Sequence, residues 1–253
     1  MINILLSGYL GQMGRVIIKS VAERNDCTIV AGVDINSSAD FFPFSTYTNF
    51  ENIKEKVDVI VDFSNPATLF GELKFAIEKK IPIVIATTGL SNEQVKSIQD
   101  ASKLVPIFYA ANMSLGVNII CELAKKAASI LYPDFNIEIV ETHHNKKVDA
   151  PSGTALMLAN EISSVLPQKP EYEYNRHSKR EKRTENEIGI HSIRAGTIPG
   201  EHEIIFAGKD EVVKISHTAL SREIFATGGL NAAFFIVNKA PGLYSMKNLL
   251  NLS

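Results

Sequence analysis

A short basic segment holds the side chains of this chain that are best suited to chemistry. It runs His143-His144-Asn145-Lys146-Lys147, so four of its five residues are His or Lys. Histidine titrates nearest neutrality, and the pKa of a lysine ammonium falls when the group is desolvated. The segment therefore predicts a site for an anionic substrate that must also receive a proton.

The sequence that follows predicts the start of a helix. Apolar residues recur at helical spacing from Ala155 to Leu166, and Ser152 or Thr154 is suited to cap a helix that ends near Pro167. The first turn of a helix has unpaired backbone N–H groups and binds carboxylate or phosphate through them. Gly153 would allow such an anion to approach the backbone closely.

The basic segment could also be a metal site or a solvated surface. Alternation over 136–142, with Ile137 and Ile139 on one face, predicts a strand that leads into the segment. Paired histidines could bind a metal, but neighbouring side chains on a strand point to opposite faces and no third ligand follows at an established spacing. The lysines could also form a solvated surface. The Pro-Ser-Gly-Thr continuation favours the anion site, and we expect no metal.

Composition places the chain among ordinary globular proteins. Its 253 residues are 45% hydrophobic and 21% charged, with a formal net charge of -2, which predicts one or two domains and no nucleic-acid partner. The basic run from Arg176 to Arg183 is interpreted as an exposed loop. Cys27 and Cys121 are too far apart to indicate a zinc site or a disulfide framework. Without a basic leader or an apolar run of about 20 residues, we expect a cytoplasmic protein that does not enter a membrane.

The N-terminal region has the pattern of a dinucleotide-binding unit. An apolar strand over 2–7 is followed by a turn with Gly8, Gly11 and Gly14, then a helix, then a strand that ends at Asp34. Glycines let the turn close tightly and let a pyrophosphate reach the helix start, while an acid about 20 residues later accepts hydrogen bonds from ribose hydroxyls. A purely structural turn is the alternative.

The residues around the predicted ribose site bear on the choice of cofactor. A carboxylate at Asp34 would repel the 2′-phosphate of NADPH, and neither Ile35 nor Asn36 supplies a compensating cation. Leu10 stands where the middle glycine of the motif usually lies, so the pattern is GxxGxxG. NADH is therefore favoured over NADPH.

Strand and helix patterns alternate up to about residue 109 and then change. The alternation predicts a parallel α/β sheet of the Rossmann type, whose loops after the strands face the cofactor or are ordinary turns. Strands expected over 188–195, 201–207 and 211–219 instead suggest a mixed sheet. We expect an α/β dinucleotide-binding domain from 1–113 and 222–253, and an α+β domain with a mixed sheet from 114–221.

Several motifs together resemble the dihydrodipicolinate reductase family over nearly the whole chain. They are Gly8-x-x-Gly11-x-Met13-Gly14, Ala86-Thr87-Thr88-Gly89, Ala111-Asn112-Met113-Ser114-x-Gly116-Val117-Asn118, Glu141-x-His143-His144-x-x-Lys147-x-Asp149-x-Pro151-Ser152-Gly153-Thr154-Ala155, and Ile193-Arg194-Ala195-Gly196-x-x-x-Gly200-Glu201-His202. The resemblance implies an oxidoreductase of lysine and diaminopimelate biosynthesis. Such an enzyme reduces 4-hydroxy-tetrahydrodipicolinate, a small cyclic dicarboxylate, to tetrahydrodipicolinate with NAD(P)H and loss of water.

The resemblance also assigns roles to residues of this chain. It implies that His143 is a proton donor or acceptor and Lys147 a second proton donor, with His144, Gly153 and Thr154 binding substrate. It implies a homotetramer assembled through the sheet of the second domain. The cofactor-binding positions would be Gly8, Tyr9, Leu10, Gly11, Gln12, Met13, Asp34, Ala86, Thr87, Thr88, Ala110, Ala111, Asn112 and Met113.

Two departures and two alternatives accompany the resemblance. Gln12 stands where many relatives carry a basic residue, which weakens the case for NADPH, and Met113 stands where many carry Phe. Another NAD-dependent dehydrogenase, such as an aspartate or homoserine dehydrogenase, would lack the histidine-lysine motif. A nucleotide-sensing regulatory protein would have no need for both His143 and Lys147.

Overall fold

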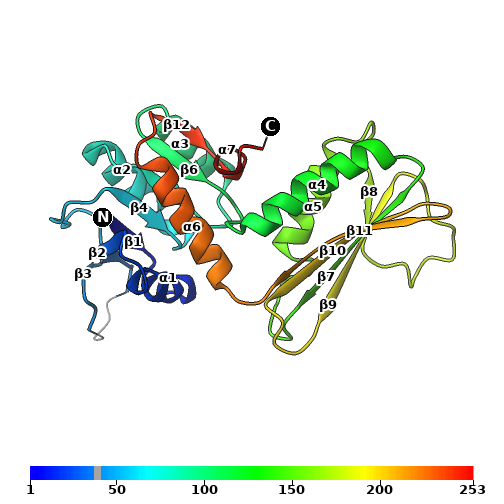
Figure 1. Ribbon diagram of the computed structural model, residues 1–253, viewed down its shortest axis with the longest axis horizontal. Coiled ribbons are helices and arrows are strands. Elements are labelled where there is room, and N and C mark those ends of the chain that lie inside the picture. The colour runs from blue at the N-terminus through cyan, green and yellow to red at the C-terminus, as the bar shows by residue number, and fades with distance from the viewer. Residues whose placement is uncertain (37–40, 253) are drawn as a thin grey trace. The chain divides into compact units, whose positions relative to one another are not determined.

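The computed structural model describes residues 1–36 and 41–252, which form two compact units. Unit 1 comprises Met1–Leu115 and Arg222–Ser253, and unit 2 comprises Gly116–Ser221. Unit 2 is therefore inserted between two parts of unit 1 along the chain (Figure 1).

Unit 1 is built on a parallel sheet. The strand order is β12-β6-β5-β4-β1-β2-β3, and each neighbouring pair is parallel. The order reverses between β1 and β4, which is where ligands bind in sheets of this kind. The predicted Rossmann-type sheet is confirmed. Its strands are β1 (Ile2–Ser7), β2 (Cys27–Val33), β3 (Ser45–Tyr47), β4 (Val59–Asp62), β5 (Ile83–Ile85), β6 (Pro106–Tyr109) and β12 (Gly242–Tyr244).

Helices cover both faces of this sheet, because its strands are apolar on both sides. Along β4, Val59 and Val61 join one core cluster, whereas Ile60 joins the other. The first cluster includes residues of α1 and α6, and the second includes residues of α2 and α3. The helical elements are α1 (Gln12–Ala22), the 3-10 turn η1 (Pro66–Thr68), α2 (Leu69–Lys79), α3 (Asn92–Ala101), α6 (Glu223–Ile236) and α7 (Met246–Leu250).

Unit 2 has a mixed sheet in the order β11-β10-β7-β9-β8. β7 pairs antiparallel with β10 and parallel with β9, as the predicted change of sheet type requires. Helices α4 and α5 pack on one face, where Ile139, Ile190 and Phe206 meet Ala124 and Leu158 in one core (Figure 1). The elements are α4 (Leu115–Leu131), β7 (Asn136–His143), α5 (Gly153–Ser163), β8 (Glu171–Glu173), β9 (Glu187–Arg194), β10 (Gly200–Ala207) and β11 (Val212–Ala219).

The elements that the sequence did not predict are short. β3, β8 and β12 have three residues each, too few to show alternation, and α7 has five. The 3-10 turn η1 precedes α2, and at its start Asn65 Oδ1 accepts a hydrogen bond from Ala67 N at 2.9 Å. Within the described ranges, no helix is both long and apolar enough to cross a membrane.

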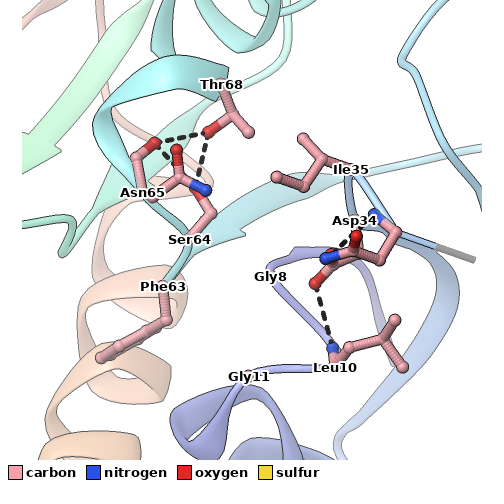
Figure 2. Close-up of a pocket in the computed structure, with 10 residues that line it drawn as sticks. Gly8, Leu10, Gly11, Asp34, Ile35, Phe63, Ser64, Asn65 and Thr68 are labelled. Carbon is pink, nitrogen blue, oxygen red and sulfur yellow. Dashed lines mark hydrogen bonds between the residues drawn. The ribbon is translucent and has the colours of Figure 1, made fainter.

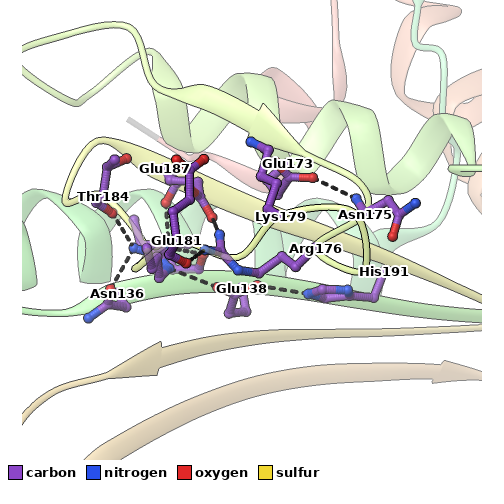
Figure 3. Close-up of polar contacts among 12 residues, drawn as sticks. Asn136, Glu138, Glu173, Asn175, Arg176, Lys179, Glu181, Thr184, Glu187 and His191 are labelled. Carbon is purple, nitrogen blue, oxygen red and sulfur yellow. Dashed lines mark hydrogen bonds and ion pairs between the residues drawn. The ribbon is translucent and has the colours of Figure 1, made fainter.

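The basic run before β9 is a loop, but it is not solvated throughout. Arg176 pairs with Glu187, and Arg183 Nε donates to Glu138 Oε1 at 3.0 Å. The other oxygen of Glu138 lies 2.8 Å from His191 Nε2 (Figure 3). The interpretation as an exposed loop was incomplete, because the acids that neutralise these arginines stand on β7 and β9 and only the folded sheet brings them near.

Candidate active site

A pocket lies in unit 1 where β1, β2 and β4 end, beside the reversal of strand order (Figure 2). The glycine turn follows β1, Asp34 follows β2 and a polar loop follows β4, and each forms part of the pocket wall. Backbone and small polar groups are what a dinucleotide needs at this edge. The lining residues are Gly8, Leu10, Gly11, Asp34, Ile35, Asn36, Phe63, Ser64, Asn65 and Thr68.

Close packing fixes the glycine turn. Gly8 has a φ of +79°, and a Cβ there would lie 2.7 Å from the carbonyl oxygen of Phe63. A Cβ at Gly14 would lie only 2.2 Å from the carbonyl oxygen of Gly8, so the turn and α1 can approach one another only without side chains. The N-cap of α1 is Gly11, which has no side chain to occupy the N–H groups of the first turn. That helix start is suited to the pyrophosphate of a dinucleotide.

Asp34 forms the opposite side of the pocket. Its carboxylate accepts hydrogen bonds from Leu10 N at 3.3 Å and from Asn36 N at 3.1 Å. Figure 2 shows it facing the glycine turn. Of the described residues that line the pocket, one is an acid and none is Lys or Arg. The arrangement fits a ribose whose hydroxyls donate to a carboxylate.

The other residues predicted to bind cofactor lie in unit 1 outside this lining set. The ring of Tyr9 is buried and packs edge-on against Phe42 at 5.0 Å between centroids, so its side chain belongs to the core. Gln12 accepts a hydrogen bond from Arg222. Ala86–Thr88 and Ala110–Met113 follow β5 and β6 at the carboxyl edge of the sheet.

Two residues of the lining were not singled out from the sequence. Phe63 directly follows β4, and Thr68 ends η1. The available signal was their place after a buried strand, because the loops after the strands were expected to face the cofactor or to be ordinary turns.

In unit 2, three adjacent strands bring the proposed chemical groups together. Glu141 and His143 lie two residues apart on β7 and therefore point to the same face of the sheet. Ile139, two residues before Glu141, packs in the core with α4 and α5, so this face is the one that the helices cover. The register places Arg194 of β9 opposite His143, and His202 of β10 opposite Glu141. Residues far apart in sequence therefore form one buried polar cluster.

Glu141 is the centre of this cluster. It is fully buried, and Arg194 donates to both of its oxygens, at 2.8 and 2.9 Å. Ser152 N donates to it at 3.1 Å, and His143 Nδ1 lies 2.5 Å from Oε2. Burial alone would raise the pKa of Glu141, but hydrogen bonds, those from Arg194 foremost and His143 among them, lower it to about 2. The carboxylate is therefore ionised at neutral pH.

An ionised Glu141 determines how His143 can act. The ring Nδ1 donates its hydrogen to the carboxylate, which leaves Nε2 as the atom that can take up or release a proton. A Cβ on Gly200 would lie 3.0 Å from Nε2, so this glycine keeps space beside the atom. Burial lowers the pKa of His143, and the bond to Glu141 only partly offsets that effect. His143 is therefore neutral at rest.

The second histidine of the cluster, His202, has a structural partner. Its Nε2 lies 3.0 Å from Ser152 Oγ, and its ring meets that of His143 edge-on at 5.2 Å. Burial first, and the nearby His143 second, lower the pKa of His202 to about 4. A neutral His202 adds no competing charge beside His143.

Lys147 lies four residues beyond His143 in the loop after β7. Its ammonium is 2.8 Å from Asp149 Oδ1, and this hydrogen bond lowers the pKa of Asp149. The lysine side chain is mostly buried, whereas that of Asp149 is mostly exposed. His144 is half-buried, and its carbonyl accepts a hydrogen bond from Lys147 N at 3.1 Å. Lys146 is exposed.

The predicted helix start is present at α5. Ser152, not Thr154, is the N-cap, and its Oγ accepts a hydrogen bond from Ala155 N at 3.1 Å. Gly153 is exposed, and a Cβ there would meet nothing within 4 Å. An anion can therefore reach the first turn of the helix.

Four residues of the cluster were absent from the predicted set: Glu141, Ser152, Arg194 and His202. Arg194 appeared only within a family motif, and the structure shows that its partner is the Glu141 carboxylate. The i, i+2 spacing of Glu141 and His143 was an available signal, because alternate residues of a strand share a face. The cross-strand partners had no local signal.

The sheet and pocket of unit 1 indicate the class of protein. A parallel sheet with a glycine turn after the first strand and an acid after the second is the fold of nucleotide-dependent oxidoreductases.

Comparison with known sequences specifies the family. The profile described as dihydrodipicolinate reductase, N-terminus, matches residues 2–113, and the profile described as dihydrodipicolinate reductase, C-terminus, matches residues 116–250. The chain belongs to the dihydrodipicolinate reductase family, as its motifs had indicated. It is accordingly a pyridine-nucleotide-dependent oxidoreductase with an NAD-binding N-terminal domain.

Individual relatives agree with this assignment. The chain is 51% identical over 249 residues to 4-hydroxy-tetrahydrodipicolinate reductase of Caldanaerobacter subterraneus subsp. tengcongensis, covering 98% of both proteins. It is 48% identical over 251 residues to the enzyme of that name from Clostridium tetani, covering 99% of this chain and 98% of the relative. The dipicolinate-bound dihydrodipicolinate reductase from Paenisporosarcina sp. TG-14 has the same fold, with a TM-score of 0.82, 23% identity and full coverage of both chains.

Proposed function

We propose that this chain reduces 4-hydroxy-tetrahydrodipicolinate to tetrahydrodipicolinate, with loss of water, in diaminopimelate and lysine biosynthesis. The observation that carries the proposal is the buried Glu141 carboxylate, which orients His143 beside the Lys147 loop and the start of α5. The names of the full-length relatives supply the substrate. A small cyclic dicarboxylate is the kind of ligand that a cationic loop and a helix start can bind together.

The reaction consumes one hydride and one proton. Loss of the ring hydroxyl as water leaves a carbon-carbon double bond conjugated with the ring imine. The reduced nicotinamide, when bound, supplies a hydride to the carbon that bore the hydroxyl. The electron pair of the double bond then moves toward the imine end, and a proton neutralises it.

His143 is proposed to hold that proton on Nε2. Glu141 fixes the ring through Nδ1 and stabilises the imidazolium form once the proton arrives. A bound dicarboxylate adds negative charge nearby, which raises the pKa of His143 from its lowered resting value. Substrate binding therefore favours the charged acid that the reaction needs.

Lys147 is proposed as the second proton donor and as a ligand for a substrate carboxylate. Its ammonium already contacts one carboxylate, that of Asp149, at 2.8 Å. His144, Gly153 and Thr154 are proposed to bind the dicarboxylate alongside it, the two latter residues through the start of α5.

In unit 1, the pocket formed after β1, β2 and β4 is proposed to bind the cofactor, with Gly8–Met13 at the pyrophosphate and Asp34 at the adenosine ribose. NADH is the proposed physiological cofactor, because the lining carries a carboxylate and lacks Lys or Arg among the described residues. Ala86–Thr88 and Ala110–Met113 are proposed to contact the nicotinamide end. Unit 1 is thereby the proposed dinucleotide domain, and unit 2 the substrate domain.

We further propose a cytoplasmic homotetramer assembled through the unit 2 sheet. The face of that sheet opposite α4 and α5 includes Ile193, which is 47% exposed. Both cysteines are buried free thiols, which accords with a reducing compartment. Light scattering during size-exclusion chromatography should give a mass four times that of the chain. Ile193→Lys should reduce that mass, and a monomeric wild type would reject the proposal.

The decisive test of the activity is loss of NADH absorbance with freshly synthesised 4-hydroxy-tetrahydrodipicolinate. We expect oxidation that depends on both reactants and forms one tetrahydrodipicolinate for each NADH consumed. Aspartate semialdehyde alone is the control substrate, because a homoserine dehydrogenase would reduce it. NADH binding without turnover of either compound would instead favour a nucleotide-sensing protein.

A further inference from the structure

Two carboxyl groups beneath the cofactor pocket have no part in the chemistry proposed above. Asp62 ends β4 and is 1% exposed, and Glu72 lies on α2 and is fully buried. One oxygen of each, Asp62 Oδ2 and Glu72 Oε2, is buried without a hydrogen-bond partner among the described residues. Two buried like charges repel one another, which disfavours ionisation of both groups together.

Ser64 connects this acid pair to the pocket. Its Oγ lies 2.5 Å from Asp62 Oδ1 and 3.4 Å from Glu72 Oε1, and its N–H donates to Asp62 Oδ1 at 2.8 Å. Ser64 also lines the pocket together with Asn65 and Thr68, and Figure 2 shows the three joined by hydrogen bonds. The state of the acids therefore bears on the shape of one pocket wall.

Among the described residues, the groups that make hydrogen bonds to the pair are polar and uncharged. Glu72 faces the hydroxyls of Ser7 on β1 and Ser64, and Asp62 faces Ser64 and Thr87 after β5. The negative charge of Asp62 acts on Glu72. Asp34, at the end of β2, lines the far side of the same pocket. Burial raises the pKa of Asp62, and burial together with the charge of Asp62 raises that of Glu72 well above its usual value.

We propose that Asp62 and Glu72 share one proton at neutral pH, and that this proton positions the Ser64–Thr68 wall of the cofactor pocket. The two acids are positioning residues, since they act through Ser64. Loss of the proton leaves two buried negative charges that repel one another around Ser64, so the wall must shift and dinucleotide affinity falls. The proposal rests on the proposed function only in placing the dinucleotide in this pocket.

The test is the dissociation constant of NADH, measured by fluorescence titration from pH 6 to pH 10 in the full-length protein. In the wild type, we expect the constant to rise with pH above the pKa of the pair, approaching about tenfold per pH unit. Glu72→Gln removes the group whose charge demands the shared proton, so its dissociation constant should stay near the neutral wild-type value throughout. Glu78→Gln, an exposed change on the same helix, is the matched control and should follow the wild type.

Each outcome has one meaning. A flat wild-type profile, or the same rise in Glu72→Gln, overturns the proposal. Failure of the wild type to bind NADH at any pH instead refutes the proposed function. If Glu72→Gln does not fold, infrared spectra of the wild type decide. A protonated carboxyl band at neutral pH that disappears in alkali supports the shared proton, and absence of that band overturns it.

Discussion

The two proposed sites of this protein are built from different materials. The pocket of unit 1 is lined by the glycine turn, a carboxylate and a polar loop, and the main chain of the turn lies so close to α1 that Gly14 has no room for a Cβ. The cluster of unit 2 consists of side chains, with four donors and two rings arranged around Glu141. A backbone site depends on where side chains are missing, whereas a side-chain site depends on which ones are present. The two should therefore respond to mutation in different ways.

Removal of the Lys147 ammonium should have the largest effect. Lys147→Ala should lower kcat by about 10³-fold, because a positioned proton donor contributes on that order. NADH affinity should not change, since the cofactor is assigned to unit 1. Lys146→Ala, at the exposed neighbour, is the matched control and should retain wild-type kcat. Steady-state rates give kcat and fluorescence titration gives NADH affinity for the two variants. Full activity in Lys147→Ala would refute the assignment of the substrate site.

The second-largest effect should come from glycine substitutions, which we expect to be costly in the unit 1 site and tolerated in the unit 2 site. Gly14→Ala should destabilise unit 1 by about 3 kcal/mol or abolish NADH binding, because its Cβ would lie 2.2 Å from a backbone oxygen that cannot move alone. Gly153→Ala should change stability by less than about 1 kcal/mol, since a Cβ there meets nothing within 4 Å. Urea unfolding with and without NADH distinguishes them. Equal tolerance at both positions would show that the glycine turn is not packed as described.

Glu141→Gln should have an intermediate effect that depends on pH. Loss of the charge should cost about 2 kcal/mol, because Arg194 keeps its burial without a carboxylate. The folded pKa of Glu141, about 2, lies below the value of 4.5 for a free side chain, so its contribution is full above pH 4.5 and is lost as pH falls toward 2. Urea unfolding should therefore show wild type and variant converging in acid. Glu138→Gln, whose ion pair on the same strand is less buried, should cost less than about 1 kcal/mol.

The smallest effect concerns the choice of nucleotide. Asp34→Ala with Ile35→Arg should shift the ratio of NADPH to NADH affinity about tenfold or more toward NADPH, because the repelling carboxylate is replaced by a cation. Asp34→Ala alone should weaken NADH binding without comparable gain for NADPH. Fluorescence titration with both cofactors measures the ratio. An unchanged ratio in the double variant would exclude Asp34 from the ribose site.

The sequence predicted those features that have a local period or a local motif. Alternation over 136–142 predicted β7, and helical spacing after Ala155 predicted α5, because burial of one face imposes those patterns directly. The glycine turn and Asp34 were predictable for the same reason: each belongs to one strand-turn-helix-strand unit. Three-residue strands such as β3 and β12 left no pattern, since they are fixed by pairing with a neighbour.

What the sequence missed depends on contacts across strands. Arg194 and His202 meet Glu141 only through the register of β9 and β10 with β7, and no local spacing encodes that register. The acid pair of Asp62 and Glu72 was missed for a related reason. Each residue alone is typical of a strand end or a helix, and only packing of α2 against β4 makes their carboxyl groups share Ser64.

The insertion of unit 2 within unit 1 has a consequence for the order in which the protein forms. Unit 2 is one continuous stretch, so its contacts can close as soon as that stretch leaves the ribosome. Unit 1 needs α6 and β12 from residues 222–253, and closing its sheet around the whole insertion carries a larger loop entropy. We therefore expect the N-terminal nucleotide pocket, although made first, to gain hydrogen-exchange protection last. Pulse-labelling of backbone amides by hydrogen exchange during refolding measures this order. Protection of the pocket before unit 2 would show that the unit 1 sheet forms without α6 and β12.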